Sequence, residues 1–518
     1  MEEPHSPQHS LDVVRQFILK RAGSQPTSPV AASSSDSAGG LLTGCGGVEV
    51  LVASVCGSLS YNLSISSSDV DYFGVFACGL EQLFRMKGPT MTLDTHEPED
   101  ICCYELTHYC QLLLKGNPKL VEPVFLDHGP IFRHALWERL RDAAGPAVLN
   151  GTVLQQYLSF AFSQLGDRAK KGGAASKNSK RLYHALRLAS EAQRIASGLP
   201  PRVYLEGHIR DRILRVRLGE DDQDEAEQEV RLLLKELDRQ PHQLPDAGAL
   251  VAFLDAWALE VRRHQLSACQ IPPTLKGELL NVESRTGDVE ELDSLGAALE
   301  RAHPDIEVAA ILAVCLSGSA LHGLVGLPEW PSRDRSADRL VIFLESGPSF
   351  LRTRKATPPT ASMVTERPGT QFLEVGLFCS LLASGNHRAF EALEQVPLFA
   401  CRAWTQLQQR SAALYSRSLH SHLLGVSSKL SASRPSERDH LLAIRLAMQA
   451  RYLAAHGRVL DPSIPEQMAP LLASHAGDLS SFRTAMCAQI GKESSSLAKT
   501  SDSRVLDAWL IPLRLVSF

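Results

Sequence analysis

The sequence predicts an α+β protein in which one module occurs twice. Segments of the first half, "VASVCGSLSYNL" and "HALRLASEAQRIASG", return in the same order as "LAVCLSGSALHGL" and "LAIRLAMQARYLAAHG", with a period of about 260 residues. Each copy begins with apolar runs of strand length around a Gly-Ser pair and continues with helical spacing. Each then becomes wholly helical. Each module is therefore expected to be a small mixed sheet flanked by helices, followed by a helical region.

These segments set the expected domain boundaries. A Ser/Gly/Pro-rich stretch, "GSQPTSPVAASSSDSAGG", has too little apolar surface to fold and predicts a disordered loop. The expected parts are an N-terminal helix at 1–22, the loop at 23–46, a first core at 47–145, a helical domain at 146–270, a second core at 280–400 and a second helical domain at 401–518.

Composition excludes several classes of protein. The 518 residues are 44% hydrophobic and 21% charged, with a net charge of −5. This is typical of a globular protein without a basic field that would attract nucleic acid or anionic membrane. The 11 cysteines are scattered without any Cys-x-x-Cys spacing, which predicts free thiols in the cytoplasm or nucleus. No apolar run approaches the ~20 residues that span a bilayer, so no membrane partner is expected.

The first core carries an unusual pair of acidic residues. Asp69 and Asp71 flank one Val in the apolar stretch "DVDYFGVF", and residues two apart on a strand point to the same face. They could be solvated carboxylates on an edge strand, although Asp is depleted from strands. Alternatively, divalent cations offset their repulsion, as at two-metal phosphoryl-transfer sites. Gly57-Ser58, just upstream, suits close approach of backbone amides and a hydroxyl to phosphate.

This combination resembles the nucleotidyltransferases of the DNA polymerase beta superfamily. "GSLSYNLSISSSDVDYFGVF" is most similar to their stand-alone microbial members, which include RNA-ligase-associated ones. The resemblance extends to "YELTHYCQLLLKGNPKLVEPVF", "SKRLYHALRLASEAQRIASG" and "ILRVRLGE", and covers about residues 45–220. Asn62 replaces a Gly of that pattern, and Asn tolerates the same left-handed backbone.

The resemblance implies the roles of several residues. Asp69 and Asp71 would ligate Mg²⁺ or Mn²⁺, and Gly57 and Ser58 would hold the phosphates of an NTP, with ATP expected. The third carboxylate is assigned to Asp100, which starts the strand "DICCYEL", rather than to Glu105 at its end.

The second copy serves as an internal control. Aligning Phe76 with Phe343 and "KGNP" with "ASGNH" gives the correspondences Asp69 to Ser336, Asp71 to Asp338, Asp100 to Gly369, Glu105 to Glu374 and Gly57-Ser58 to Gly318-Ser319. The second copy retains only one of the three carboxylates, and a single Asp cannot hold two metal ions. Asp334 and Glu345 do not lie at strand positions from which they could replace the other two. The second module is therefore interpreted as a degenerate, non-catalytic copy, and Glu105 as structural because that copy keeps it.

A basic run, "DRAKKGGAASKNSKR", leads into a predicted helix. Lys180, His184 and Arg187 lie at i, i+4 and i+7, hence on one face. They are candidates for binding the nucleotide, where cations could neutralise triphosphate or pyrophosphate. The alternative is a solvated helix face beside a loop.

Two functions follow. The first is Mg²⁺-dependent transfer of NMP from an NTP to an acceptor: an RNA end, a protein or a small molecule. The second is a catalytically inactive binding or scaffolding protein that uses the nucleotide cleft. The sequence leaves the acceptor, the base of the NTP and the oligomeric state open.

Overall fold

The chain divides into two compact units, one formed mainly by residues up to Gln270 and the other mainly by residues from Ile271. They are described from a computed structural model, in which both are α+β. The structure describes residues 7–22, 45–97, 99–129, 131–170, 175–245, 247–285, 289–317, 338–351, 363–364, 370–430, 437–460, 464, 466–468, 470, 479–490, 497–499 and 501–518.

The first unit is built on a five-stranded mixed sheet of order β3-β4-β2-β1-β5. Its strands are β1 (Glu49–Cys56), β2 (Asp71–Ala77), β3 (Thr92–Thr95), β4 (Asp100–Glu105) and β5 (Ile131–Arg133). β2 runs antiparallel to β1 and parallel to β4, as expected for a small mixed sheet. The sequence analysis expected β1, β2 and β4 but missed the edge strands β3 and β5, which are only four and three residues long.

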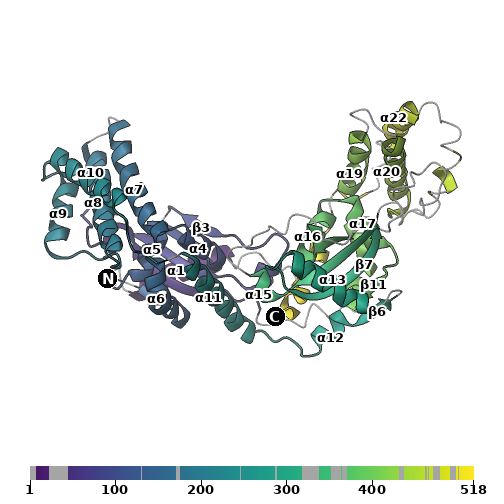
Figure 1. Cartoon of the computed structure of the whole chain (residues 1–518), viewed down its shortest axis with the longest axis horizontal. Helices are drawn as coiled ribbons and strands as arrows, with labels where there is room; N and C mark the ends of the chain where they lie inside the picture. The colour runs from purple at the N-terminus through teal and green to yellow at the C-terminus, as the bar shows by residue number, and fades with distance from the viewer. Residues whose placement is uncertain are drawn as a thin grey trace. The chain divides into compact units, whose positions relative to one another are not determined.

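Helices cover both faces of this sheet (Figure 1). Alternate strand residues face opposite sides: Leu51 and Phe73 join the larger core, whereas Tyr72 and Phe76 pack with Val14 of α1 (Pro7–Ala22). The helices after β1 are α2 (Gly57–Ser60), α3 (Leu80–Phe84), α4 (Leu106–Leu114), α5 (Pro118–Phe125), α6 (Ala135–Val148), α7 (Gly151–Lys170), α8 (Ala175–Ala196), α9 (Gly207–Leu218), α10 (Gln223–Arg239) and α11 (Ala247–Ser267). The expected helical region is α7 to α11, in which α8 packs against α7, α9 and α10.

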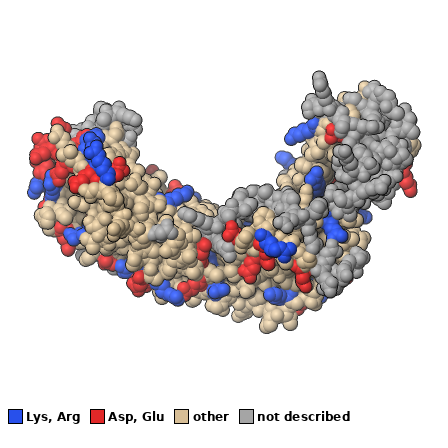
Figure 2. All heavy atoms as spheres, in the orientation of Figure 1, with Lys and Arg blue, Asp and Glu red and all other residues tan. Residues whose placement is uncertain are grey.

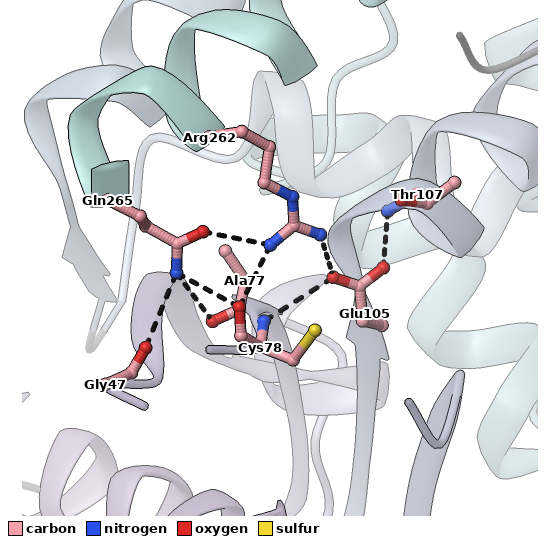
Figure 3. Close-up of polar contacts among 7 residues, drawn as sticks. All are labelled: Gly47, Ala77, Cys78, Glu105, Thr107, Arg262 and Gln265. Atoms are coloured by element: carbon pink, nitrogen blue, oxygen red, sulfur yellow. Dashed lines mark hydrogen bonds and ion pairs between the residues drawn. The ribbon is translucent and has the colours of Figure 1, made fainter. Parts of the chain in front are cut away.

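A buried ion pair fastens α11 to the sheet. Glu105, at the end of β4, accepts a hydrogen bond from the Thr107 N–H (2.8 Å) and so caps α4. Its carboxylate also pairs with Arg262 of α11, and both side chains are almost fully buried. Arg262 and Gln265 in turn donate to the Cys78 carbonyl at 3.0 and 3.1 Å (Figure 3). Glu105 therefore acts as a structural residue, as the sequence analysis expected.

The second unit has a six-stranded mixed sheet of order β6-β11-β7-β8-β10-β9. Its elements are α12 (Leu275–Leu280), β6 (Val282–Arg285), α13 (Val289–Ala302), β7 (Val308–Ser317), β8 (Asp338–Glu345), α15 (Gly347–Phe350), β9 (Met363–Val364), β10 (Thr370–Glu374), α16 (Val375–Ala383), α17 (His387–Glu394), β11 (Phe399–Cys401), α18 (Arg402–Gln409), the 3₁₀ helix η2 (Ser411–Leu414), α19 (Arg417–Lys429), α20 (Glu437–His456), α22 (Leu479–Ile490) and α23 (Ser503–Val516).

The two sheets share strand order and strand direction. β9, β10, β8, β7 and β11 follow one another as β3, β4, β2, β1 and β5 do, and β8 is likewise antiparallel to β7 and parallel to β10. Phe343 is the register partner of Glu374, as Phe76 is of Glu105. This is the alignment that the sequence repeat predicts.

The buried ion pair is also present in both units. Glu374 caps α16 by accepting from the Gly376 N–H (2.7 Å) and pairs with Arg514 of α23. A second buried pair joins Glu122 to Arg187 in the first unit and Glu391 to Arg445 in the second.

Two global expectations can be compared with the structure. All eleven cysteines are free thiols, as their spacing predicted. No helix in the described part of the chain has the length and apolar character needed to cross a membrane. On the face drawn in Figure 2, Lys and Arg side chains are interspersed with Asp and Glu side chains.

Candidate active site

The ends of three neighbouring strands bring the candidate acidic residues together. Asp71 is the first residue of β2, and its register partners are Cys56, which ends β1, and Asp100, which begins β4. Neighbouring strands lie about 4.8 Å apart, so Asp71 and Asp100 stand side by side at one edge of the sheet. Burial, then Asp100 and then Asp69 raise the pKa of the Asp71 carboxyl.

Asp69 reaches this edge from outside the sheet. The strand begins at Asp71, so Asp69 belongs to the extended segment before it and is exposed to solvent. The expectation that both aspartates lie within the strand is wrong in this respect, because pairing with β1 stops where that strand ends at Cys56. The charge of Asp69 still acts on Asp71.

The three carboxylates are neighbours, but their oxygens do not all lie within 4.8 Å of one another. Among the described residues, the only group of three His, Cys, Asp or Glu side chains whose ligating atoms all lie within 4.8 Å of one another is elsewhere in the unit. The raised pKa of Asp71 reflects burial first and then the repulsion from Asp100 and Asp69. Carboxylate oxygens are the ligands that Mg²⁺ prefers, so this set of donors fits a divalent cation that would draw them together.

Gly57 is packed directly against the acidic edge. Its φ of 67° is left-handed, and a Cβ at this position would overlap Oδ2 of Asp71. Only glycine satisfies both conditions. The Gly-Ser pair forms the start of the short helix α2 rather than an open turn. Ser58, the next residue, is half-buried.

Arginines of α9 hold the loop that leads to Asp69. Arg217 donates to the Leu63 carbonyl and, at 2.9 Å, to Ser68 Oγ. Arg210 donates to the Asn62 carbonyl at 2.9 Å. Asn62 has a φ of 58°, which confirms that it takes the left-handed backbone expected for it. The helical region thus fixes the loop between α2 and β2, a role that the sequence analysis missed.

Two lysines act electrostatically on the acidic edge. Lys180 of α8 is exposed, and its charge and that of Lys119 each lower the pKa of Asp71. Lys119 was not among the predicted residues. It is the second residue of α5, after the N-cap Asn117, whose side chain accepts from the Lys119 N–H at 3.1 Å. The signal was present in the sequence, because Lys119 follows the Gly-Asn-Pro that marks the end of the preceding helix.

His184 lies deeper on the same face of α8. Burial, together with Arg187, Lys180 and other cations, lowers its pKa to about 3. The imidazole is therefore neutral at physiological pH. It stacks on Tyr183 with ring centroids 4.2 Å apart.

Arg187, the third predicted residue of this face, lies in the interior. It is 5% exposed, pairs with Glu122 at 2.6 Å and lies over the Tyr61 ring at 3.8 Å. Tyr61 donates to the other oxygen of Glu122 at 2.7 Å. Tyr61 is the C-cap of α2. Arg187 therefore connects α8 to the helix that starts at Gly57.

Asp100 and Glu105 have different environments although they share β4. The Asp100 side chain is 47% exposed and lies 3.2 Å from His96 Nδ1. Glu105 is fully buried, pairs with Arg262 and caps the N-terminus of α4. Only Asp100 is accessible to a ligand.

Several positions named in the sequence analysis lie outside the described residues. In the second unit these are Gly318, Ser319, Asp334, Ser336 and Gly369. The side chains of Asp338 and of the basic run before Ser179 are likewise not described.

Comparison with known protein families gives a match over most of the first unit. The model of the RNA repair pathway DNA polymerase beta family matches residues 43–259. The matched segment contains the whole sheet of the first unit and helices α2 to α10. No curated protein and no solved structure matches the chain.

Proposed function

We propose that the first unit, whose residues 43–259 match the model of the RNA repair pathway DNA polymerase beta family, is a Mg²⁺-dependent nucleotidyltransferase. It transfers NMP from an NTP, ATP being the expected one, to an acceptor and releases pyrophosphate. The observation that carries the proposal is the pairing of Asp71 with Asp100 beside Gly57.

Asp69, Asp71 and Asp100 would hold Mg²⁺ or Mn²⁺. The bound metal would polarise the α-phosphoryl group and stabilise the charge that develops there. The exposed carboxylate of Asp100 is the candidate base for the acceptor hydroxyl, because it can reach solvent while Asp71 is half-buried. Its hydrogen-bond partner His96 keeps the carboxylate oriented.

Gly57 and Ser58 are proposed to hold the phosphates. The absence of a Cβ at Gly57 lets the backbone approach Asp71 and, with it, the phosphate oxygens. Lys180 and Lys119 supply positive charge beside the carboxylates and would bind the β- and γ-phosphates and the leaving pyrophosphate. His184, neutral and half-buried, offers one donor and one acceptor to the nucleotide.

Arg187 has a positioning role in this proposal. Its guanidinium lies in the interior, paired with Glu122 and placed over the Tyr61 ring, so it acts on the nucleotide through α2 rather than by contact. It was expected to bind the nucleotide directly, and its burial favours the indirect role.

We also propose that the second unit is a degenerate, non-catalytic copy of the first. The shared strand order, the equivalent register of Phe343 and the two repeated buried ion pairs support a tandem duplication. The sequence alignment replaces two of the three carboxylates with Ser336 and Gly369. The copy would retain the parts that fold the module and lack those that the chemistry needs. A location in the cytoplasm or nucleus remains a prediction.

The proposal is tested by label transfer. The full chain is incubated with each α-³²P-labelled NTP, Mg²⁺ or Mn²⁺, and separate RNA, protein and metabolite fractions of a cell extract. Label is expected in one fraction, to depend on the metal and to be lost in Asp71→Asn. The matched control is Asp238→Asn, an exposed position on α10. Transfer that persists in Asp71→Asn contradicts the proposal, and binding of NTP without transfer to any fraction supports the scaffolding alternative.

A further inference from the structure

Three polar side chains converge on the first unit at the end of β1 opposite the acidic edge. Glu49 is the first residue of β1, His134 is the N-cap of α6, and His264 lies in the last turn of α11. Cys56 lies seven residue steps along the strand from Glu49, which is about 23 Å at ~3.3 Å per residue. This cluster is therefore distinct from the aspartate site.

The distances within the cluster match those between ligand atoms that share one metal ion. Glu49 Oε1 lies 3.2 Å from His134 Nε2 and 3.3 Å from His264 Nε2. Charge-assisted N–H···O bonds are shorter, about 2.7–2.9 Å. Ligand atoms bonded to one tetrahedral zinc ion at ~2.0–2.1 Å lie about 3.3 Å from each other. All three ligating atoms lie within 4.8 Å of one another.

One of the two oxygens of Glu49 has no partner among the described residues. This oxygen, Oε2, is buried. The carboxylate as a whole is 20% exposed. A buried carboxylate oxygen without a donor is costly, and a cation between Glu49 and the two imidazoles would offset that cost.

The scaffold holds these three side chains in place without help from them. β1 pairs with β5, and the His134 N–H donates to the Leu51 carbonyl at 2.9 Å. Trp257 of α11 donates to the Leu136 carbonyl of α6 at 2.7 Å. A site on three elements that are already joined needs little backbone reorganisation to bind a ligand.

The second unit keeps this scaffold but not the cluster. Trp404 is buried on α18 as Trp137 is on α6, and Trp509 donates to the Ala403 carbonyl as Trp257 does to Leu136. Cys401 lies three residues before Trp404, where His134 stands before Trp137. Val516 follows Arg514 as His264 follows Arg262. The module therefore folds without these two histidines, which points to a ligand-binding purpose in the first unit.

We propose that Glu49, His134 and His264 bind one divalent transition-metal ion of the zinc class, with a water molecule in the fourth position. His and carboxylate ligands in a tetrahedral set are typical of zinc. His264, whose side chain is 56% exposed, leaves that position open to solvent. The bound ion fastens α6 and α11 to β1.

Metal binding requires a change of tautomer at His134. Its Nδ1 accepts a hydrogen bond of 3.3 Å from the Leu136 N–H, so the neutral ring carries its proton on Nε2. Coordination through Nε2 moves this proton to Nδ1, and the cap is lost. The loss is tolerable because Cys401 occupies the equivalent N-cap of α18 with no side-chain hydrogen bond.

The test is metal binding by the full chain after treatment with a chelator. We expect one equivalent of Zn²⁺ to survive gel filtration, to raise the melting temperature, and to bind at least about 100-fold more weakly in His264→Asn. Glu49→Gln should behave alike. His208→Asn, an exposed histidine of α9, is the matched control. Both cluster variants should melt near the metal-free wild type, which shows that they fold.

Other outcomes identify another site and overturn the proposal. Binding that is retained in His264→Asn and Glu49→Gln but lost in Asp71→Asn would place the ion on the aspartates. A sulfur-to-cobalt charge-transfer band with Co²⁺ would place it on cysteines. Failure of wild type to bind Zn²⁺ at micromolar concentration would overturn it as well. None of these results depends on transferase activity.

Discussion

Asp71 and Asp100 are register partners on two parallel strands, each the first residue of its strand. This single relationship joins carboxylates that lie 29 positions apart in the sequence and places Gly57 and Asp69 beside them. The remaining features of the site, from the lysines of α5 and α8 to the loop held by α9, are arranged around this pair.

The acidic edge costs stability when no cation is bound. The pKa of Asp71 is raised by burial and by Asp100 and Asp69. The folded state therefore holds its proton more tightly than the unfolded state, and the free energy of unfolding falls as pH rises from the unfolded pKa through the folded one. We expect Asp71→Asn to raise the melting temperature of the metal-free chain at pH 7.5 and to have less effect at pH 4. An equal shift for Asp238→Asn would contradict this explanation.

Gly57 is predicted to be required for activity because it has no Cβ and takes a left-handed backbone. Gly57→Ala puts a Cβ onto the Asp71 carboxylate and forces a left-handed backbone on alanine. We expect stability to fall by about 1–2 kcal/mol and transfer to fall by roughly 100-fold or more. Denaturant unfolding and label transfer measure the two effects. Gly88→Ala, with a φ of 63° but open space around it, should carry the backbone cost alone and retain transfer.

The buried Glu105–Arg262 pair is predicted to act on folding only. Arg262→Met leaves a buried carboxylate without its partner and should lower the free energy of unfolding of the first unit by about 3–5 kcal/mol. Arg514→Met should do the same for the second unit, because it leaves the buried Glu374 without its partner. Chemical denaturation followed by near-ultraviolet circular dichroism measures both. Restoration of stability by the double change Glu105→Gln with Arg262→Met would support the buried charge as the cause.

Glu191 of α8 is expected to make the free energy of unfolding depend on pH near neutrality. It is buried, accepts from the Arg202 N–H, and burial raises its pKa to about 7. Because this folded pKa lies above the unfolded one, Glu191 lowers stability increasingly as pH rises from about 4.5 to 7. Glu191→Gln should therefore stabilise the chain by about 1–3 kcal/mol more at pH 8.5 than at pH 4.5. A pH-independent difference would show that the residue does not titrate in this range.

Local patterns in the sequence predicted much of this fold. The apolar runs predicted β1, β2 and β4, and Gly116-Asn117-Pro118, which lies at the junction of α4 and α5, is a local helix-stop pattern. The acidic stretch after Gly219 begins α10, where Asp222 accepts from the N–H groups of Asp224 and Glu225. These features depend on neighbouring residues, so one sequence is enough to find them.

Features that depend on distant residues were missed. β3 and β5 are short, and tertiary pairing rather than propensity makes them strands. Nothing in the local pattern shows that Arg187 is buried against Glu122, 65 residues away, whereas Lys180 on the same face is exposed. The His134–Glu49–His264 cluster likewise appears only when helices from distant parts of the chain pack onto the sheet.

The central claim is that Asp69, Asp71 and Asp100 bind a divalent cation together with an NTP. Electron paramagnetic resonance of Mn²⁺ with a non-hydrolysable ATP analogue tests this directly, with His264→Asn as background to exclude the other proposed metal site. The account predicts tight Mn²⁺ binding that weakens at least about 100-fold in Asp71→Asn and in Asp100→Asn, and that weakens as pH falls because Asp71 takes up a proton. Equal binding of Mn²⁺ and the analogue by the His264→Asn chain and by its two double variants, with Asp71→Asn and with Asp100→Asn, would contradict it.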